Sequence, residues 1–199
     1  MKKILLSAAL ILMTTGSAIA APVIGEPAPA FTGTDTNGVE HSLSDFTGST
    51  VVLEWTNPEC PYVRKHYNTG NMQALQAEAT QEGIVWLTIA SSADGKQGYM
   101  TPDEANALIT EEGSQATARI LDPSGEIGGL YDAKTTPHMF VIDPAGVLVY
   151  QGAIDDDPSF KKDNMETATN YVRSAWEAVA SGENVEVSTS QPYGCSVKY

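Results

Sequence analysis

The sequence has few basic residues. In 199 residues, 11 lysines and arginines stand against 25 aspartates and glutamates, which gives a formal net charge of −14. Two of the basic residues, Lys2 and Lys3, lie at the very start, and without them the remaining 9 basic and 25 acidic residues carry a charge of −16. Such an acidic surface repels phosphate backbones and anionic lipid head groups. We therefore expect neither a nucleic acid nor a membrane surface as a partner.

Long apolar runs are also scarce, and the one that exists lies within the first 20 residues. The apolar run from Ile4 to Met13 follows two lysines, and Ala18-Ile19-Ala20 forms an Ala-x-Ala cleavage pattern. This arrangement is typical of a bacterial secretory signal peptide, and the run is too short for a membrane span. The alternative is an uncleaved N-terminal anchor. We expect residues 1–20 to be a signal peptide removed near Ala20, and the mature protein to be periplasmic or secreted.

The rest of the chain has no glycine-rich nucleotide loop, no internal repeat and no low-complexity stretch. No organic cofactor is therefore implied. Asp155-Asp156-Asp157 has no spaced metal ligands around it, so we interpret it as a solvated loop and expect no metal site there. Residues 21–187 are long enough for one α/β domain with a sizeable core, and residues 188–199 form a C-terminal tail.

Cysteine is the scarcest reactive residue, with only Cys60 and Cys195. In an exported chain an even number of cysteines suggests a disulfide. Two interpretations remain open. The bridge could be a permanent staple that ties the tail to the domain, or Cys60 could be a nucleophile that Cys195 resolves.

Cys60 lies where a strand meets a helix. The β-branched run Thr50–Thr56 predicts a buried strand, and Pro61 suits the first turn of a helix. Cys60 would then be the N-cap, with the free amides of the first turn directed at its sulfur. The adjacent Glu59 disfavours a thiolate, whereas Arg64 one turn later favours it. We expect a modestly lowered thiol pKa, and hence a nucleophilic thiolate.

Further elements are predicted from hydrophobic periodicity, capping residues and turn signals. They are a hairpin over 31–43, a helix over 61–83 broken at 68–70, a strand at 84–90, a helix at 101–112, a strand at 118–121, a helical turn at 125–131, strands within 136–143 and 147–150, and an amphipathic helix from 163 to 179.

This order of elements resembles the thioredoxin-like superfamily. Trp55 at the end of a strand, followed by Cys60 at a helix start, is similar to one half of that family's signature. Thr136-Pro137 before Phe140–Asp143 resembles the other half, the cis-proline loop that lies against the redox cysteine. The resemblance implies an α/β thioredoxin-like fold, with a central mixed β-sheet, helices on both faces and an N-terminal β-hairpin.

Within the superfamily the chain is most similar to the redoxin branch, which includes the alkyl hydroperoxide reductase/thiol-specific antioxidant proteins and their peroxiredoxin-like relatives. Two departures stand out. Val63 occupies the place of the second cysteine of a Cys-x-x-Cys motif, so a resolving thiol must be Cys195 or belong to another molecule. Asn57 stands where peroxiredoxins set a Thr or Ser, and no arginine lies near 136–143, which speaks against robust peroxide reduction.

The resemblance implies an exported thiol oxidoreductase that acts on a small peroxide or a protein disulfide, with a thioredoxin-like dithiol protein as its electron donor. The candidate catalytic residues are Cys60, Cys195, Glu54, Thr136 and Pro137. Glu54 lies where thioredoxins carry a buried acid, so it is either a general base with a raised pKa or a solvated glutamate at an edge.

Two other functions are compatible with the sequence. One is a non-catalytic binding domain held by a Cys60–Cys195 disulfide. The other is a metallochaperone that uses Cys60, His66 and His138, although the second cysteine that such proteins carry close to the first is absent. Apart from this possibility, we interpret His66 as an ordinary surface or loop residue.

Overall fold

The computed structural model describes residues 21–161 and 167–199. The predicted signal peptide, residues 1–20, and the first part of the predicted C-terminal helix lie outside the described residues. Within the described ranges, no helix combines the length and the apolar character that crossing a bilayer requires.

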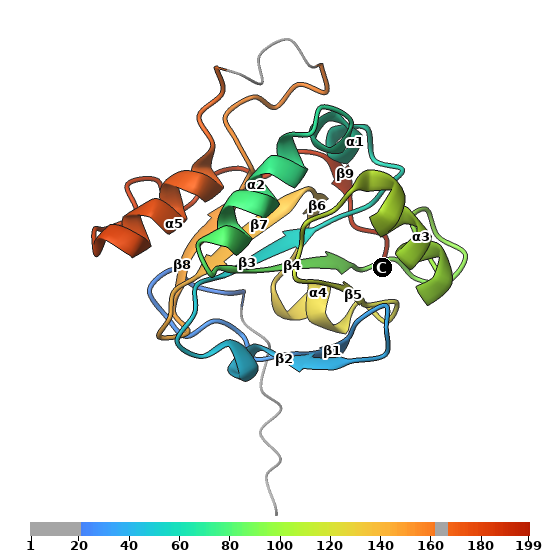
Figure 1. Cartoon of the computed structure of the whole chain (residues 1–199), viewed down its shortest axis with the longest axis horizontal. Helices are drawn as coiled ribbons and strands as arrows, with labels where there is room; N and C mark the ends of the chain where they lie inside the picture. The colour runs from blue at the N-terminus through green and yellow to red at the C-terminus, as the bar shows by residue number, and fades with distance from the viewer. Residues whose placement is uncertain (1–20, 162–166) are drawn as a thin grey trace, which may run out of the picture.

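A five-stranded mixed sheet forms the centre of the domain (Figure 1), as the resemblance predicted. The strand order is β5-β4-β3-β7-β8, with β3, β4 and β5 parallel and β7 and β8 antiparallel to their neighbours. The strands are β3 (Val51–Trp55), β4 (Val85–Ala90), β5 (Ala118–Leu121), β7 (His138–Ile142) and β8 (Leu148–Gly152). Every residue of β3 is buried, because this central strand is covered on both faces.

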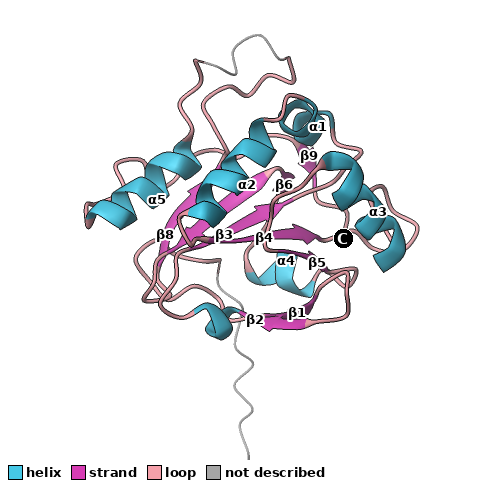
Figure 2. Ribbon diagram, viewed as in Figure 1, coloured by secondary structure: helices cyan, strands magenta, loops and turns pink. Residues whose placement is uncertain are grey.

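Helices cover both faces of the sheet (Figure 2). On one face lie α1 (Pro61–Asn68), α2 (Asn71–Gln81) and α5 (Tyr171–Ser181). On the other face lie α4 (Glu126–Leu130) and the hairpin of β1 (Thr32–Thr34) and β2 (Glu40–Ser42). The remaining helices are η1 (Leu43–Phe46) and α3 (Pro102–Glu112).

Each face of the sheet buries its own apolar cluster. The face under α1, α2 and α5 packs Val52, Trp86, Met139 and Val141 against Val63, Leu75, Val172 and Trp176. The opposite face packs Leu53, Trp55, Ile89 and Phe140 against Phe31, Ile127 and Tyr131. Burying each of these large side chains contributes roughly 1.5–3 kcal/mol, so the two clusters hold the carboxyl end of β3 rigidly in place.

Local signals set the helix ends. The predicted break between α1 and α2 is present, with Gly70 in the left-handed region at φ 77°. Thr101 and Glu104 form the capping box that begins α3. The C-terminal helix is shorter than the periodicity predicted. It begins at Tyr171, because the Asn170 side chain accepts from the Arg173 amide and caps it there.

The C-terminal segment is docked rather than free. Its strand β9 (Cys195–Ser196) pairs antiparallel with β6 (Thr135–Thr136), so that Cys195 lies opposite Thr136. Upstream, the Gln151 amide donates to the Ser188 carbonyl, and the Ser190 amide donates to the Gln151 carbonyl. The last residues of the chain therefore return to the start of α1, where β9 and β6 lie side by side (Figure 1).

Candidate functional site

Cys60 occupies the N-cap of α1, as the sequence predicted. Its backbone is extended, at φ −76° and ψ 124°, and Pro61 follows at the first helical position. The side chain is 0 % exposed. Its thiol donates to the Thr136 carbonyl oxygen at 3.0 Å. The sulfur thus lies at a helix start and against a loop that is 76 residues further along the chain.

The loop that faces Cys60 has the conformation that the resemblance implied. The Thr136-Pro137 peptide bond is cis. Thr136 is buried, and its hydroxyl has no hydrogen-bond partner in the described part of the chain. Leaving a buried hydroxyl without a hydrogen-bond partner costs free energy. The Thr136 hydroxyl would recover this free energy by donating to a new acceptor that forms beside it.

Cys195 completes the arrangement. It is partly exposed and lies across the β6–β9 ladder from Thr136. Both cysteines are free thiols, and they are hydrogen-bonded to each other through their side chains. The structure therefore brings together four of the five candidate residues: Cys60, Thr136, Pro137 and Cys195.

The environment shifts the pKa values of the two thiols in opposite directions. Burial of Cys60 opposes its ionisation, but hydrogen bonding from the Cys195 side chain and the Val63 amide outweighs burial and lowers its pKa. The Val63 amide belongs to the first turn of α1, whose free N–H groups favour a negative charge on the sulfur. Burial and the hydrogen bond to Cys60 raise the pKa of Cys195 to about 11. Of the two thiols, Cys60 is therefore the one that ionises more readily.

Thr136→Val should raise the pKa of Cys60, because it removes a hydroxyl that can donate to the thiolate. The measurement is the ultraviolet absorbance of the thiolate as a function of pH. Thr135→Val is the matched control, since the Thr135 hydroxyl donates to the Pro137 carbonyl instead. Equal pKa values in the wild type and Thr136→Val would contradict a role for this hydroxyl.

Gly194 is a site residue that sequence reasoning missed. Its φ is 135°, and a Cβ at this position would overlap the Thr136 carbonyl oxygen. Only glycine lets the tail approach the cis-proline loop this closely. The tail sequence contains a Gly-Cys pair at this position, but nothing in the sequence indicated which part of the backbone the glycine would contact.

Gly194→Ala should push β9 away from β6 and separate the two sulfurs. We expect oxidant-driven formation of the Cys60–Cys195 bridge to slow by about 10-fold or more, because misplacing reacting groups by about 1 Å is costly. Gly95→Ala is the control, since Gly95 also has a positive φ, 73°, but open space around it. Quenched alkylation with mass spectrometry follows bridge formation. Bridging of Gly194→Ala at the rate of the control would refute the close approach.

Glu54, the fifth candidate, belongs to a separate buried network. Its carboxylate accepts from Trp86 Nε1 at 2.8 Å, from the Tyr67 hydroxyl at 2.9 Å and from Gln76 Nε2 at 3.1 Å. The side chain is fully buried, which excludes the solvated alternative, and burial raises its pKa. Among the described residues, no hydrogen bond joins this carboxylate to Cys60.

The structure corrects the interpretation of His66 and of the acidic triplet. His66 is wholly buried, and burial lowers its pKa to about 3, so it is not a surface residue. Asp155 and Asp157 are buried as well, not part of a solvated loop. His138 is buried at the start of β7, and burial lowers its pKa to about 4. The described ranges contain no group of three His, Cys, Asp or Glu side chains that could hold a metal ion.

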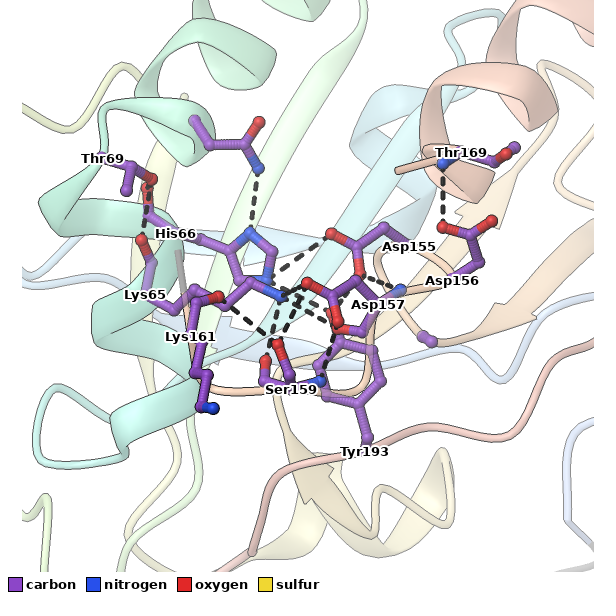
Figure 3. A network of polar contacts seen from close by, with 12 residues as sticks. Lys65, His66, Thr69, Asp155, Asp156, Asp157, Ser159, Lys161, Thr169 and Tyr193 are labelled. Atoms are coloured by element: carbon purple, nitrogen blue, oxygen red, sulfur yellow. Dashed lines mark hydrogen bonds and ion pairs between the residues drawn. The ribbon is translucent and has the colours of Figure 1, made fainter. Parts of the chain in front are cut away.

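A buried polar network that includes His66, Asp155 and Asp157 anchors the tail (Figure 3). Lys65 Nζ donates to the Asp157 carbonyl oxygen at 2.9 Å and to its carboxylate at 3.2 Å. The Tyr193 hydroxyl donates to Asp155 and lies 3.4 Å from His66 Nε2. Sequence reasoning missed Lys65 and Tyr193, because a lysine on a helix normally indicates a solvated face.

Comparison with known proteins agrees with this geometry. The AhpC/TSA family profile matches residues 24–151. A thiol-disulfide oxidoreductase, ResA of Bacillus subtilis, is 27% identical over 132 residues, which cover 63% of this chain and 64% of ResA, slightly less than two thirds of that relative.

Two solved structures show the same fold. A hypothetical protein from Sinorhizobium meliloti superposes with a TM-score of 0.78 at 23% identity, covering 90% of this chain and 96% of the other. The thioredoxin domain of a thiol-disulfide oxidoreductase from Bacteroides vulgatus gives a TM-score of 0.52 at 21% identity, covering 66% and 89%. With its family match across the sheet and the loop of Pro137, the chain belongs to the AhpC/TSA family of thioredoxin-like redoxins.

Proposed function

We propose that this protein is an exported thiol-disulfide oxidoreductase in which Cys60 is the nucleophile and Cys195 the resolving thiol. One observation carries the proposal: two free thiols are hydrogen-bonded to each other at the start of α1 and against the cis Thr136-Pro137 bond. The opposite pKa shifts of the two thiols support this choice of roles, because the thiolate is the attacking form.

The reaction proceeds in two exchanges. The Cys60 thiolate attacks one sulfur of a substrate disulfide, which forms a mixed disulfide and expels the other substrate sulfur as a thiolate. Cys195 then loses its proton and attacks the Cys60 sulfur, which forms the Cys60–Cys195 bridge and releases the second substrate thiolate. The substrate gains two electrons, and the protein loses two. A dithiol protein would return those electrons.

Glu54 is proposed as the proton acceptor of the resolving step. Burial raises the pKa of this carboxyl, which makes the carboxylate a stronger base. Glu54→Gln tests this role. The Gln carbonyl oxygen can still accept from Trp86 and Gln76, while its amide group can donate to the Tyr67 hydroxyl. A slower resolving step in a variant that stays folded supports the proposal, and an unchanged rate refutes it.

The comparisons favour disulfide exchange over peroxide reduction. The B. subtilis relative is named as a thiol-disulfide oxidoreductase. The side chain of Asn57, three residues before Cys60, bonds to two loops: its Oδ1 accepts from the Glu59 amide at 2.9 Å and its Nδ2 donates to the Gln97 carbonyl oxygen at 3.2 Å. It is therefore engaged by its own loop and by the loop between β4 and α3, and does not replace the Thr or Ser of peroxiredoxins.

Mass mapping of the isolated protein tests the proposal against its main rival, a permanent staple. The reduced chain is treated with oxidised glutathione or with hydrogen peroxide, quenched with an alkylating reagent and digested. We expect a Cys60–Cys195 link that forms with either oxidant and disappears on treatment with reduced thioredoxin. A link that is already present and resists thioredoxin would identify a structural disulfide. Two thiols that never bridge would also refute the proposal.

Export is tested separately. We propose that the chain is cleaved near Ala20 and works in a periplasmic or extracellular compartment, where the Cys60–Cys195 bridge can persist. N-terminal sequencing of the protein recovered from a bacterial host should give a chain that begins at Ala21. A protein that retains Met1–Ala20 after fractionation would contradict this proposal.

A further inference from the structure

The chain beyond Cys195 is bonded to the body of the domain on two sides. The Val197 amide donates to the Lys134 carbonyl oxygen at 3.1 Å, and the Ala93 amide donates to the Lys198 carbonyl oxygen at 2.9 Å. Lys134 lies just before β6, and Ala93 lies in the loop that follows β4. The backbone of this segment is therefore held between two loops, in addition to the two residue pairs of the β6–β9 ladder.

Tyr199 adds an aromatic side chain to these backbone contacts. Its hydroxyl donates to the Ala133 carbonyl oxygen at 2.8 Å. The side chain lies against α4, where a Cβ at Gly125 would overlap Cδ1 of the ring and a Cβ at Gly128 would overlap the hydroxyl oxygen. The tyrosine therefore occupies a seat on α4 that exists because two glycines have no side chain.

Gly128 is the more informative of the two glycines, because its own backbone does not require glycine. Its φ is not in the positive region, and it lies inside α4, where alanine is more stable than glycine. The next residue, Gly129, has open space around it. The lack of a side chain at position 128 thus makes room for Tyr199 and, beside it, for the Ser91 hydroxyl.

Cys195 lies between two anchored tyrosines. Only three residues separate it from Tyr199, and on its other side the hydroxyl of Tyr193 donates to Asp155. A ladder of two residue pairs is too short to be stable by itself, and its ends would open easily. The contacts on either side therefore decide how much of the time Cys195 stands opposite Thr136 and beside Cys60.

We propose that Tyr199 is a positioning residue of the redox pair: its seat on α4 holds Cys195 within bonding reach of Cys60 and so sets the equilibrium between the two thiols and their bridge. This inference rests on the proposed function and adds a residue that tunes it. With oxidised glutathione as the oxidant, the two thiols lose two electrons and two protons and their S–S bond forms, while the glutathione disulfide breaks and gives two glutathione thiols.

The physical basis is the effective concentration of one thiol at the other. Two groups that are held together in the folded chain react as one unit, and this advantage is lost when one of them moves away. A loosened segment brings Cys195 to Cys60 less often, so the bridge becomes less stable relative to the two thiols. A residue that only stabilised the fold would stabilise both redox forms equally and would leave this equilibrium unchanged.

The test measures the bridge equilibrium of the full chain in glutathione redox buffers. Wild type and Tyr199→Ala are equilibrated over a range of glutathione ratios and quenched by alkylation, and mass spectrometry gives the bridged fraction. We expect the equilibrium constant for bridge formation to fall by about 10-fold or more in Tyr199→Ala. Tyr199→Phe keeps the ring in its seat and should retain a constant within about threefold of the wild type.

Two glycine variants test the seat from the side of α4. Gly128→Ala fills the space of the Tyr199 hydroxyl and should also lower the equilibrium constant. Gly129→Ala is the matched control in the same helix, since its Cβ would meet no other atom. This pair gives a result even when Tyr199→Ala does not fold. An equal effect of the two glycine variants would overturn the assignment of the seat.

The thiol pKa of Cys60 is a second readout that a purely structural role would not change. The Cys195 side chain is one of the groups that lower this pKa, so the reduced Tyr199→Ala chain should titrate at a higher pH than the wild type. Loss of stability in Tyr199→Ala without a change in the bridge equilibrium would overturn the inference and leave the oxidoreductase intact. A wild-type chain that forms no bridge at any glutathione ratio would overturn the proposed function instead.

Discussion

Replacing Cys60 by serine should lower the rate of disulfide exchange by about 10³-fold or more, to the level of the uncatalysed reaction. A serine hydroxyl at the helix start does not ionise near neutrality, so the hydrogen bonds that lower the pKa of Cys60 cannot turn it into a nucleophilic anion. The assay is the reduction of insulin disulfides by the full chain in the presence of dithiothreitol.

Cys195→Ser is the matched variant for this experiment. It keeps the attacking thiolate but removes the thiol that resolves the mixed disulfide. With dithiothreitol left out, we expect it to form one equivalent of a covalent Cys60–substrate adduct and then stall, whereas Cys60→Ser should form none. Full activity in Cys60→Ser, or an adduct on Cys195 alone, would reverse the assigned roles.

Glu54→Leu should lower the free energy of unfolding by at least about 3 kcal/mol, because it leaves buried donors of Trp86, Tyr67 and Gln76 without their acceptor, at roughly 1–3 kcal/mol each. The leucine methyl groups recover little of this free energy, because they cannot accept hydrogen bonds from the three donors that surround them. Urea denaturation followed by tryptophan fluorescence measures the change.

Glu54→Gln separates the loss of hydrogen bonds from the loss of charge. Because the amide can keep all three contacts, we expect it to cost only about 1 kcal/mol. A loss of similar size in both variants would show that the negative charge, and not the hydrogen-bonding pattern, stabilises this part of the core. A negligible loss in Glu54→Leu would contradict the network itself.

Sequence reasoning placed Cys60 correctly at the start of α1, because that position depends on local chemistry. A proline at the first helical position places Cys60 at the N-cap whatever the rest of the chain does. The start of α3 at Thr101 and the break before α2 at Gly70 are equally local, and both were predicted within one residue. The cis Thr136-Pro137 bond was predicted from family resemblance alone, since an X-Pro bond permits either isomer.

Such local signals do not predict the path of the C-terminal tail. β9 contains only two residues, too few for a period-2 pattern, and its partner strand β6 lies about 60 residues earlier in the chain. The buried Lys65 was missed, and Asp155 was misjudged, for a related reason. Charged residues are usually solvated, and only the path of the tail brings Tyr193 over them. The position of Cys195 beside Cys60 is thus a tertiary property.

The most direct test of the central claim is a redox equilibrium of the wild-type chain. The protein is equilibrated in glutathione and dithiothreitol buffers of defined potential, and differential alkylation with mass spectrometry gives the fraction that carries the Cys60–Cys195 bridge. We predict a single two-electron transition at a potential above about −300 mV, within reach of cellular dithiol proteins. A bridge that stays oxidised well below that potential, or thiols that do not bridge at any potential, would contradict a reversible redox pair.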